Sequence, residues 1–244
     1  MNDSHHSTVD FAAFDVLTFD CYGTLIDWEV GLGGALREAL GAGADGIGDE
    51  ELLERYGRHE AALEAGPYLP YRSVLGRGLE GVAADLGIDV GAGAVGRFGG
   101  SVAEWPAFPD SAAALERLAS RFRLGVLTNC DDDLFAASRD RLGARFAWVV
   151  TAQQVGAYKP AEAHFRALFE RVGADGVDPG RVLHVAQSLY HDHVPAKRLG
   201  MTTVWIDRRR DRPGFGATPP AEVTPDARFA SMEAFADAAS PVTG

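Results

Sequence analysis

The chain has 244 residues, 46% of them hydrophobic, so it is long enough for one large domain with a sizeable core, or for a core with one insertion. Its formal net charge of −12 at pH 7 argues against nucleic acid or an anionic membrane as a partner, because both require a basic face. Two cysteines are too few for a secreted disulfide framework. No apolar stretch approaches the roughly 20 residues of a membrane span. From these two observations we expect a cytoplasmic protein.

The first predicted element is a buried strand over residues 16–19, which ends at Asp20 and is followed by a polar turn that contains Gly23. The Asp20 carboxylate is therefore expected at the carboxyl end of a strand, where open α/β sheets carry their chemistry. Two residues further on, position 22 is Tyr and not a second acidic residue. The absence of a second acid at this position limits the reactions that Asp20 can support.

The segment after this turn has almost no strand signal and is rich in Ala, Leu, Glu and Arg. Its pattern predicts helices that include residues 50–63 and 71–86. We interpret residues 28–104 as a helical cap inserted into an α/β core formed by residues 1–27 and 105–244. An insertion at this point is expected to lie over the carboxyl edge of the sheet and to exclude water from it.

Strand-like and helix-like runs alternate after the cap. Strands are predicted over residues 124–127, 147–151, 182–185 and 202–206, and helices over 111–121, 133–142, 161–172, 194–199 and 231–239. Short strands separated by helices are typical of βαβ units, so we expect a Rossmann-like α/β fold with a mainly parallel sheet. The basic run Arg208–Arg210 is flanked by acids and is predicted to be a solvated loop.

Polar side chains follow four of the predicted strands. They are Asp20 after the first, Thr128 and Asn129 after the second, Lys159 after the third, and Gln187, Ser188 and Asp192 after the fourth. This order of an acid, a hydroxyl–amide pair, a lysine and a second acid, with an insertion after the first acid, resembles the haloacid dehalogenase superfamily over residues 14–239. The resemblance implies a Rossmann-like core and a helical cap.

Most members of that superfamily are phosphatases, and the chain departs from their pattern in two places. Tyr22 replaces the acid that protonates the leaving oxygen, and a phenol with a pKa of about 10 is a poor proton donor at neutral pH. Ala186 and Gln187 replace the usual Gly-Asp pair, and a neutral amide is a weak ligand for Mg²⁺. A halide leaving group requires neither a proton nor a metal, so these two replacements do not prevent its departure. The Asp-x-Tyr-Gly-Thr motif that begins at Asp20 is similar to that of the L-2-haloacid dehalogenase branch.

This similarity implies a hydrolase that converts short 2-haloalkanoic acids into 2-hydroxy acids without a metal or another cofactor. Asp20 is expected to displace the halide and form an aspartyl ester, which water then hydrolyses. The resemblance assigns Lys159 to keep Asp20 ionised, Asp192 to anchor Lys159 and position the water, and Thr24 to stabilise the turn. The expected substrate contacts are Tyr22, Thr128, Asn129, Gln187, Ser188 and a cap arginine, with Arg58 as the first candidate and Arg72 as the second.

Two other functions stay open from the sequence. A phosphatase-type hydrolase of the same superfamily would hold Mg²⁺ with Asp192 and use another group as the acid. A binding relative without turnover is favoured by the altered segment 186–188. The expected partner is a small anionic 2-haloacid, and the resemblance leaves a homodimer open although no surface stripe argues for one.

Overall fold

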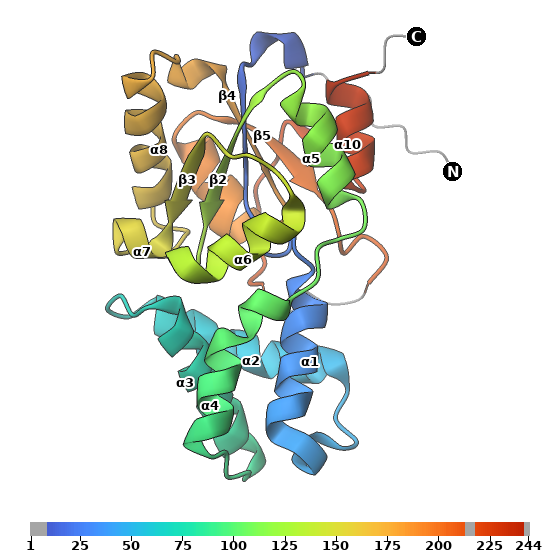
Figure 1. The fold of residues 1–244 in the computed structure, drawn as a ribbon, viewed down its shortest axis with the longest axis vertical. Helices are drawn as coiled ribbons and strands as arrows, with labels where there is room; N and C mark the ends of the chain where they lie inside the picture. The colour runs from blue at the N-terminus through green and yellow to red at the C-terminus, as the bar shows by residue number, and fades with distance from the viewer. Residues whose placement is uncertain (1–8, 213–217, 242–244) are drawn as a thin grey trace.

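The computed structural model describes residues 9–212 and 218–241. Six strands in this part of the chain form one parallel sheet in the order β3-β2-β1-β4-β5-β6. They are β1 (Val16–Phe19), β2 (Arg123–Thr128), β3 (Trp148–Thr151), β4 (Val182–Ala186), β5 (Thr202–Ile206) and β6 (Ala227–Phe229). Helices surround the sheet (Figure 1), so the predicted Rossmann-like α/β fold is confirmed.

The core helices lie within two residues of the predicted segments. They are α5 (Ser111–Ala119), α6 (Asp132–Leu142), α8 (Ala163–Ala174), α9 (Val194–Arg198) and α10 (Met232–Ala239). Two short elements, β6 and the helix α7 (Ala152–Val155), were not predicted, because three or four residues are too few to show a hydrophobic period. None of the described helices is long and apolar enough to cross a membrane.

The centre of the sheet is formed by β1 and β4, which are buried along their whole length. Strands buried on both faces of a parallel sheet consist mainly of apolar residues, and this explains their clear signal in the sequence. Thr18 and His184 are polar exceptions that face each other in register, with 3.0 Å between Thr18 Oγ1 and His184 Nδ1. A polar pair at the centre of a sheet indicates a role beyond packing.

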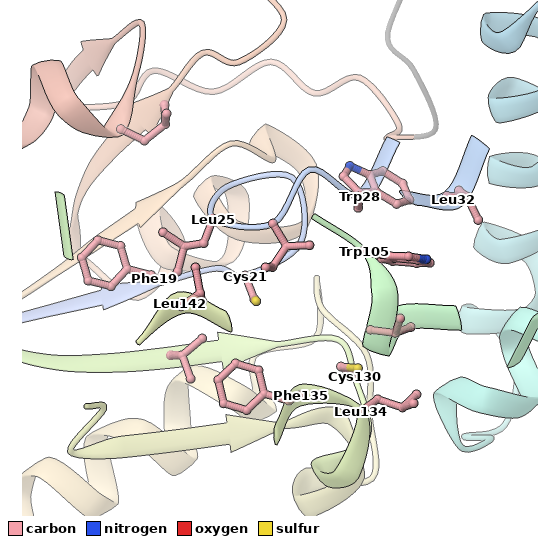
Figure 2. Close-up of a cluster of buried hydrophobic side chains, with 14 of the residues drawn as sticks. Phe19, Cys21, Leu25, Trp28, Leu32, Trp105, Cys130, Leu134, Phe135 and Leu142 are labelled. Atoms are coloured by element: carbon pink, nitrogen blue, oxygen red, sulfur yellow. The ribbon is translucent and has the colours of Figure 1, made fainter. Parts of the chain in front are cut away.

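Four helices lie between β1 and α5 and form a layer beside the carboxyl edge of the sheet (Figure 1). They are α1 (Trp28–Leu40), α2 (Asp49–Glu64), α3 (Tyr71–Leu86) and α4 (Ala92–Gly100), and we refer to residues 28–104 as the cap. Buried side chains continue from the core into the cap, with Trp28 and Trp105 at the junction (Figure 2). Both cysteines, Cys21 and Cys130, are buried and unpaired in this region.

The cap is tied to the core by ion pairs from the loop after β5. Arg209 is mostly buried and pairs with Glu29 of α1 and Glu50 of α2. Arg208 pairs with Asp110 and lies over the ring of Phe108, with 4.0 Å between its guanidinium carbon and the ring centroid. The prediction of a solvated loop is therefore wrong for these two arginines, because distant acids in the sequence come to meet them.

A core carboxylate also completes the first turn of a cap helix. The residue that precedes α3 is Pro70, whose side chain cannot accept a hydrogen bond, so the helix has no cap of its own. Asp131 follows β2 and accepts hydrogen bonds from the backbone N–H groups of Tyr71 (2.9 Å) and Arg72 (3.0 Å). Asp131 therefore acts as an N-cap across the boundary between core and cap.

We expect Asp131→Ala to lower the free energy of unfolding by about 2 kcal/mol, because it leaves two N–H groups at a helix start without an acceptor. Urea denaturation followed by circular dichroism measures this change. Asp133→Ala is the matched control, because Asp133 is exposed, pairs with Arg72 on the surface and otherwise accepts only the N–H of its neighbour Leu134. The control is expected to change stability by less than about 0.5 kcal/mol. Equal effects of the two substitutions would contradict the capping role.

Candidate functional site

A cavity of about 50 Å³ lies between the cap and the residues that follow the strands. Core residues that line it are Asp20, Tyr22, Asn129, Lys159, Gln187, Ser188, His191, Asp192 and Thr218, and cap residues are Trp28, Glu60, Glu64 and Tyr71. A single water needs about 10–15 Å³ of such volume, so the cavity has room for only a few small groups. Its size therefore suits a short substrate.

Asp20 lies directly after β1, and each oxygen of its carboxylate accepts one hydrogen bond. Thr24 Oγ1 donates to Oδ2 over 2.7 Å, and Lys159 Nζ donates to Oδ1 over 2.8 Å. The Thr24 hydroxyl is itself fixed, because it accepts the backbone N–H of Gln187 over 2.9 Å. Burial raises the pKa of Asp20, whereas the positive charge of Lys159 and the two donors act in the opposite direction.

Lys159 is the centre of the site, and its side chain is only 1% exposed. Its ammonium group donates to Asp20, to Asp192 Oδ1 over 2.7 Å and to the backbone oxygen of Leu127 over 3.0 Å, so all three N–H donors are used. Burial alone would lower the pKa of Lys159, but Asp192 and Asp20 raise it above its ordinary value. Lys159 is therefore charged at neutral pH and fixed between two carboxylates.

Asp192 lies in a single turn of π-helix, Leu189–His193, that follows β4. Besides Lys159, its Oδ1 atom contacts His184 Nε2 at 3.0 Å, and His184 in turn contacts Thr18. Although burial raises the pKa of Asp192, Lys159 and His184 lower it below the usual range of an aspartate. A chain of polar contacts thus runs from the centre of the sheet to Asp20.

The sequence did not lead us to His184, although a signal was present. It is the only ionisable residue within β4, whose other members are Val182, Leu183, Val185 and Ala186. A histidine inside such an apolar strand needs a buried partner, and here Asp192 and Thr18 supply two. His184 is a positioning residue, because it contacts Asp192 and does not line the cavity.

The residues that were expected to contact the substrate do not all line the cavity. Tyr22, Asn129, Gln187 and Ser188 line the cavity, whereas Thr128 does not. The Tyr22 hydroxyl lies 3.0 Å from Ser138 Oγ, so mainly its ring is available to a substrate. Asn129 uses both ends of its amide to hold the backbone of Lys159, at 2.7 and 3.2 Å. The observed contacts of Asn129 therefore orient Lys159.

The structure does not bring either candidate arginine of the cap to the cavity. Arg58 is exposed on α2, and Arg72 pairs with Asp133 over 2.7 Å on the surface. Among the lining residues that the structure describes, no arginine is present, and the cap contributes two glutamates, Glu60 and Glu64. The helical periodicity of α2 could have indicated both glutamates, because they lie on the same face of the helix as the buried Leu53 and Tyr56.

The sequence leaves a phosphatase that holds Mg²⁺ with Asp192 open, but the side chains here do not form a suitable set of ligands. Lys159 Nζ bridges Asp20 and Asp192 and takes the position where a cation between these two carboxylates would lie. Gln187 offers only a neutral amide. Within residues 9–212 and 218–241, no group of three or more His, Cys, Asp or Glu side chains could hold a metal ion.

The cavity lies where the cap covers the carboxyl edge of a Rossmann-like sheet, with Asp20 after the first strand and the buried Lys159 beside it. A family model for haloacid dehalogenase-like hydrolases matches residues 14–198, and the chain belongs to this family. A search of curated proteins by sequence finds no match.

Solved structures with the same fold include three informative relatives. The L-2-haloacid dehalogenase from Xanthobacter autotrophicus is 20% identical, with a TM-score of 0.77 over 94% of this chain and 100% of its own. The defluorinating L-2-haloacid dehalogenase Rha0230 is 18% identical, with a TM-score of 0.76 over 92% of this chain and 94% of its own. The HAD-type hydrolase YfnB from Bacillus subtilis, bound to magnesium, is 17% identical, with a TM-score of 0.73 over 90% of this chain and 96% of its own. At these identities the likeness shows the shared fold.

Proposed function

We propose that this chain hydrolyses the carbon–halogen bond of short 2-haloalkanoic acids and releases 2-hydroxy acids. The observation that carries the proposal is the Asp20 carboxylate, which faces a small cavity and is oriented by Lys159 and Thr24. Tyr22 and Gln187 support a leaving group that requires neither a proton nor a metal. The fold that the chain shares with L-2-haloacid dehalogenases supports the same reaction.

In the proposed reaction, one Asp20 oxygen attacks the carbon that bears the halogen. The carbon–halogen bond breaks, the halide leaves with the bonding electron pair, and an ester forms on Asp20. Water then attacks the Asp20 carbonyl carbon, and the bond from this carbon to the substrate oxygen breaks. One proton of the water passes to the substrate oxygen, and the other is released to solvent. The 2-hydroxy acid leaves with an oxygen from Asp20, and the carboxylate is restored. A related structure of the Xanthobacter autotrophicus enzyme contains covalently bound chloropropionic acid, which supports such an ester.

The neighbours of Asp20 have distinct roles in this scheme. Lys159 stabilises the ionised carboxylate before attack and the negative charge that develops on its oxygen during hydrolysis. Asp192 lines the cavity, and its Oδ2 atom is buried without a hydrogen-bond partner in the described chain. This free acceptor suits Asp192 to receive a hydrogen bond from the hydrolytic water. His184 and Lys159 fix the other oxygen of the same carboxylate.

The proposal predicts halide release from racemic 2-chloropropionate and from chloroacetate at the same rate with and without EDTA. The physical reason is that a halide is a weak base and leaves with its electron pair unaided. Ion chromatography of released chloride measures the rate, and hydrolysis of a phosphate ester with Mg²⁺ is assayed in parallel. Phosphate release that depends on Mg²⁺, without halide release, would identify a phosphatase instead. A folded protein that releases neither product would favour a binding relative.

A further inference from the structure

The two oxygens of the Asp192 carboxylate have different surroundings. Its Oδ1 atom accepts a hydrogen bond from Lys159 Nζ over 2.7 Å and lies 3.0 Å from His184 Nε2. Its Oδ2 atom is buried without a hydrogen-bond partner in residues 9–212 and 218–241, although Asp192 lines the cavity. Two contacts on one oxygen fix the orientation of the carboxylate and leave the other oxygen as a free acceptor.

Of the two residues that hold Asp192 Oδ1, only His184 is independent of Asp20. The ammonium group of Lys159 is shared between Asp192 and Asp20, so it belongs to both carboxylates. The described hydrogen-bond partners of the His184 ring are Asp192 and Thr18. Without His184, the Asp192 carboxylate could turn about its bond to Lys159, whereas Asp20 would keep both of its donors.

The neighbours of His184 determine which ring nitrogen carries the hydrogen. The pKa of Asp192 is lowered, so its carboxylate has no hydrogen at neutral pH and Nε2 of His184 must be the donor. In a neutral ring Nδ1 is then an acceptor, and the Thr18 hydroxyl at 3.0 Å donates to it. The other acceptor near this hydroxyl, the backbone oxygen of Leu183, is further away at 3.4 Å. Thr18 therefore favours the tautomer that donates to Asp192.

Rigid elements hold the His184 ring in place. His184 and Thr18 are fully buried and face each other in register on the central strands β4 and β1. The ring of Phe165 from α8 packs against the His184 ring at 79°, with 5.1 Å between their centroids. Asp192 itself lies in a single π-helical turn, and residues on strands are held more precisely than residues in short connecting turns. The sheet thus supplies the orientation of Asp192.

We propose that Thr18 and His184 are positioning residues for hydrolysis of the Asp20 ester and not for halide displacement. The inference rests on the proposed function, because that reaction forms the ester. Displacement requires the Asp20 carboxylate, whose two donors do not depend on His184. Hydrolysis also requires a water aligned with the ester carbonyl carbon, and Asp192 Oδ2 accepts from this water in the correct direction while His184 holds Oδ1.

Two substitutions of His184 separate its hydrogen bond from its packing. Leucine removes the donor, whereas the amide nitrogen of glutamine reaches about as far as Nε2 and can still donate to Asp192. Rapid-quench kinetics with 2-chloropropionate in excess over the full chain measures chloride from the first turnover onward. For His184→Leu we expect the first turnover within about threefold of the natural rate and later turnovers at least about thirtyfold slower. Chloride should then appear as a burst of about one per chain.

Mass spectrometry of the quenched protein gives a second readout. The peptide that contains Asp20 should carry the ester in His184→Leu, whereas His184→Gln should restore turnover to within about fivefold of the natural rate. Thr18→Val keeps the shape of the side chain and removes its hydroxyl, so it should accumulate the same ester. Circular dichroism verifies the fold of each variant, and Thr18→Val tests the inference alone if His184→Leu does not fold.

Thr203→Val is the matched control for Thr18→Val. Thr203 is also buried and lies beside His184 in register, on β5, but its hydroxyl lies 3.5 Å from Asp226 Oδ2 and makes no described contact with the His184 ring. This control is expected to keep the natural rates of both steps within about twofold. An equal effect of the two valine substitutions would indicate a general disturbance of the sheet and overturn the inference.

The remaining outcomes distinguish this inference from the proposed function. Equal losses in both steps of His184→Leu, or a His184→Gln variant as slow as His184→Leu, would overturn the positioning role and leave the reaction standing. Natural rates of both steps in Thr18→Val would do the same for Thr18. A natural chain that releases no chloride from any 2-haloacid would overturn the proposed function, and with it the inference.

Discussion

Replacement of Asp20 by Asn is expected to lower kcat for halide release by roughly 10⁵-fold, to the background of the assay. The amide is a poor nucleophile, so the ester cannot form at a useful rate. The substitution preserves the size of the side chain and one oxygen that can still accept from Lys159 or Thr24. The fold should therefore survive, and circular dichroism verifies this before the rate is measured.

Isotope labelling distinguishes a nucleophilic Asp20 from a general base. With enzyme in excess over substrate in ¹⁸O water, the label is expected to enter the Asp20 carboxylate, because water attacks the ester carbonyl. Mass spectrometry of the peptide that contains Asp20 detects it. Label that appears in the hydroxy acid and not in this peptide would contradict the covalent route, because water would then have attacked the substrate directly.

Asp15→Asn is the matched control for this experiment. Asp15 lies at the opposite end of β1, and its exposed carboxylate pairs with Arg181 far from the cavity. This variant is expected to retain the rate of the natural chain within about twofold, since surface ion pairs contribute little. A comparable loss of activity in both variants would indicate a general effect on β1 rather than a role for Asp20.

The sequence was sufficient to predict the sheet and that Asp20, Lys159 and Asp192 meet at its carboxyl edge, because both depend on local patterns. Buried parallel strands are runs of apolar residues, and Asp20, Lys159 and Asp192 each follow one of them. The carboxyl ends of parallel strands meet at one edge, so residues more than a hundred positions apart could be expected to meet there. Their distances of 2.7 and 2.8 Å agree with that expectation.

The cap side of the cavity could not be predicted in the same way. A helix presents a different side chain to its neighbour every 100° or so, and the choice of face depends on how the helix packs. Arg58 was favoured for its charge, whereas packing of α2 turns Glu60 and Glu64 toward the core and leaves Arg58 exposed. Arg209 likewise could not be recognised as buried, because its partner Glu29 lies 180 positions away.

Replacement of Lys159 by Met is expected to lower the free energy of unfolding by about 3–5 kcal/mol at pH 7. Methionine fills a similar volume, so the loss reflects the charge and three hydrogen bonds rather than a cavity. Asp20 and Asp192 would remain buried near each other without their shared cation. Halide release is expected to fall by more than about 10³-fold in the same variant, because Asp20 would become protonated and lose its orientation.

The pH dependence of stability tests whether this loss is electrostatic. Without Lys159, burial and mutual repulsion raise the pKa values of Asp20 and Asp192 above those of the unfolded chain, so the variant gains stability as the pH falls. In the natural chain the pKa of Asp192 is lowered, so its contribution is fully present above the ordinary pKa of an aspartate and is lost only below it. The difference between the two proteins should therefore narrow between pH 7 and pH 4 in urea denaturation. Lys197→Met is the control, because it removes a partly exposed ion pair with Asp226, and it should lower the free energy of unfolding by less than about 1 kcal/mol. If the loss of stability in Lys159→Met stays constant with pH, the cause is packing and not charge.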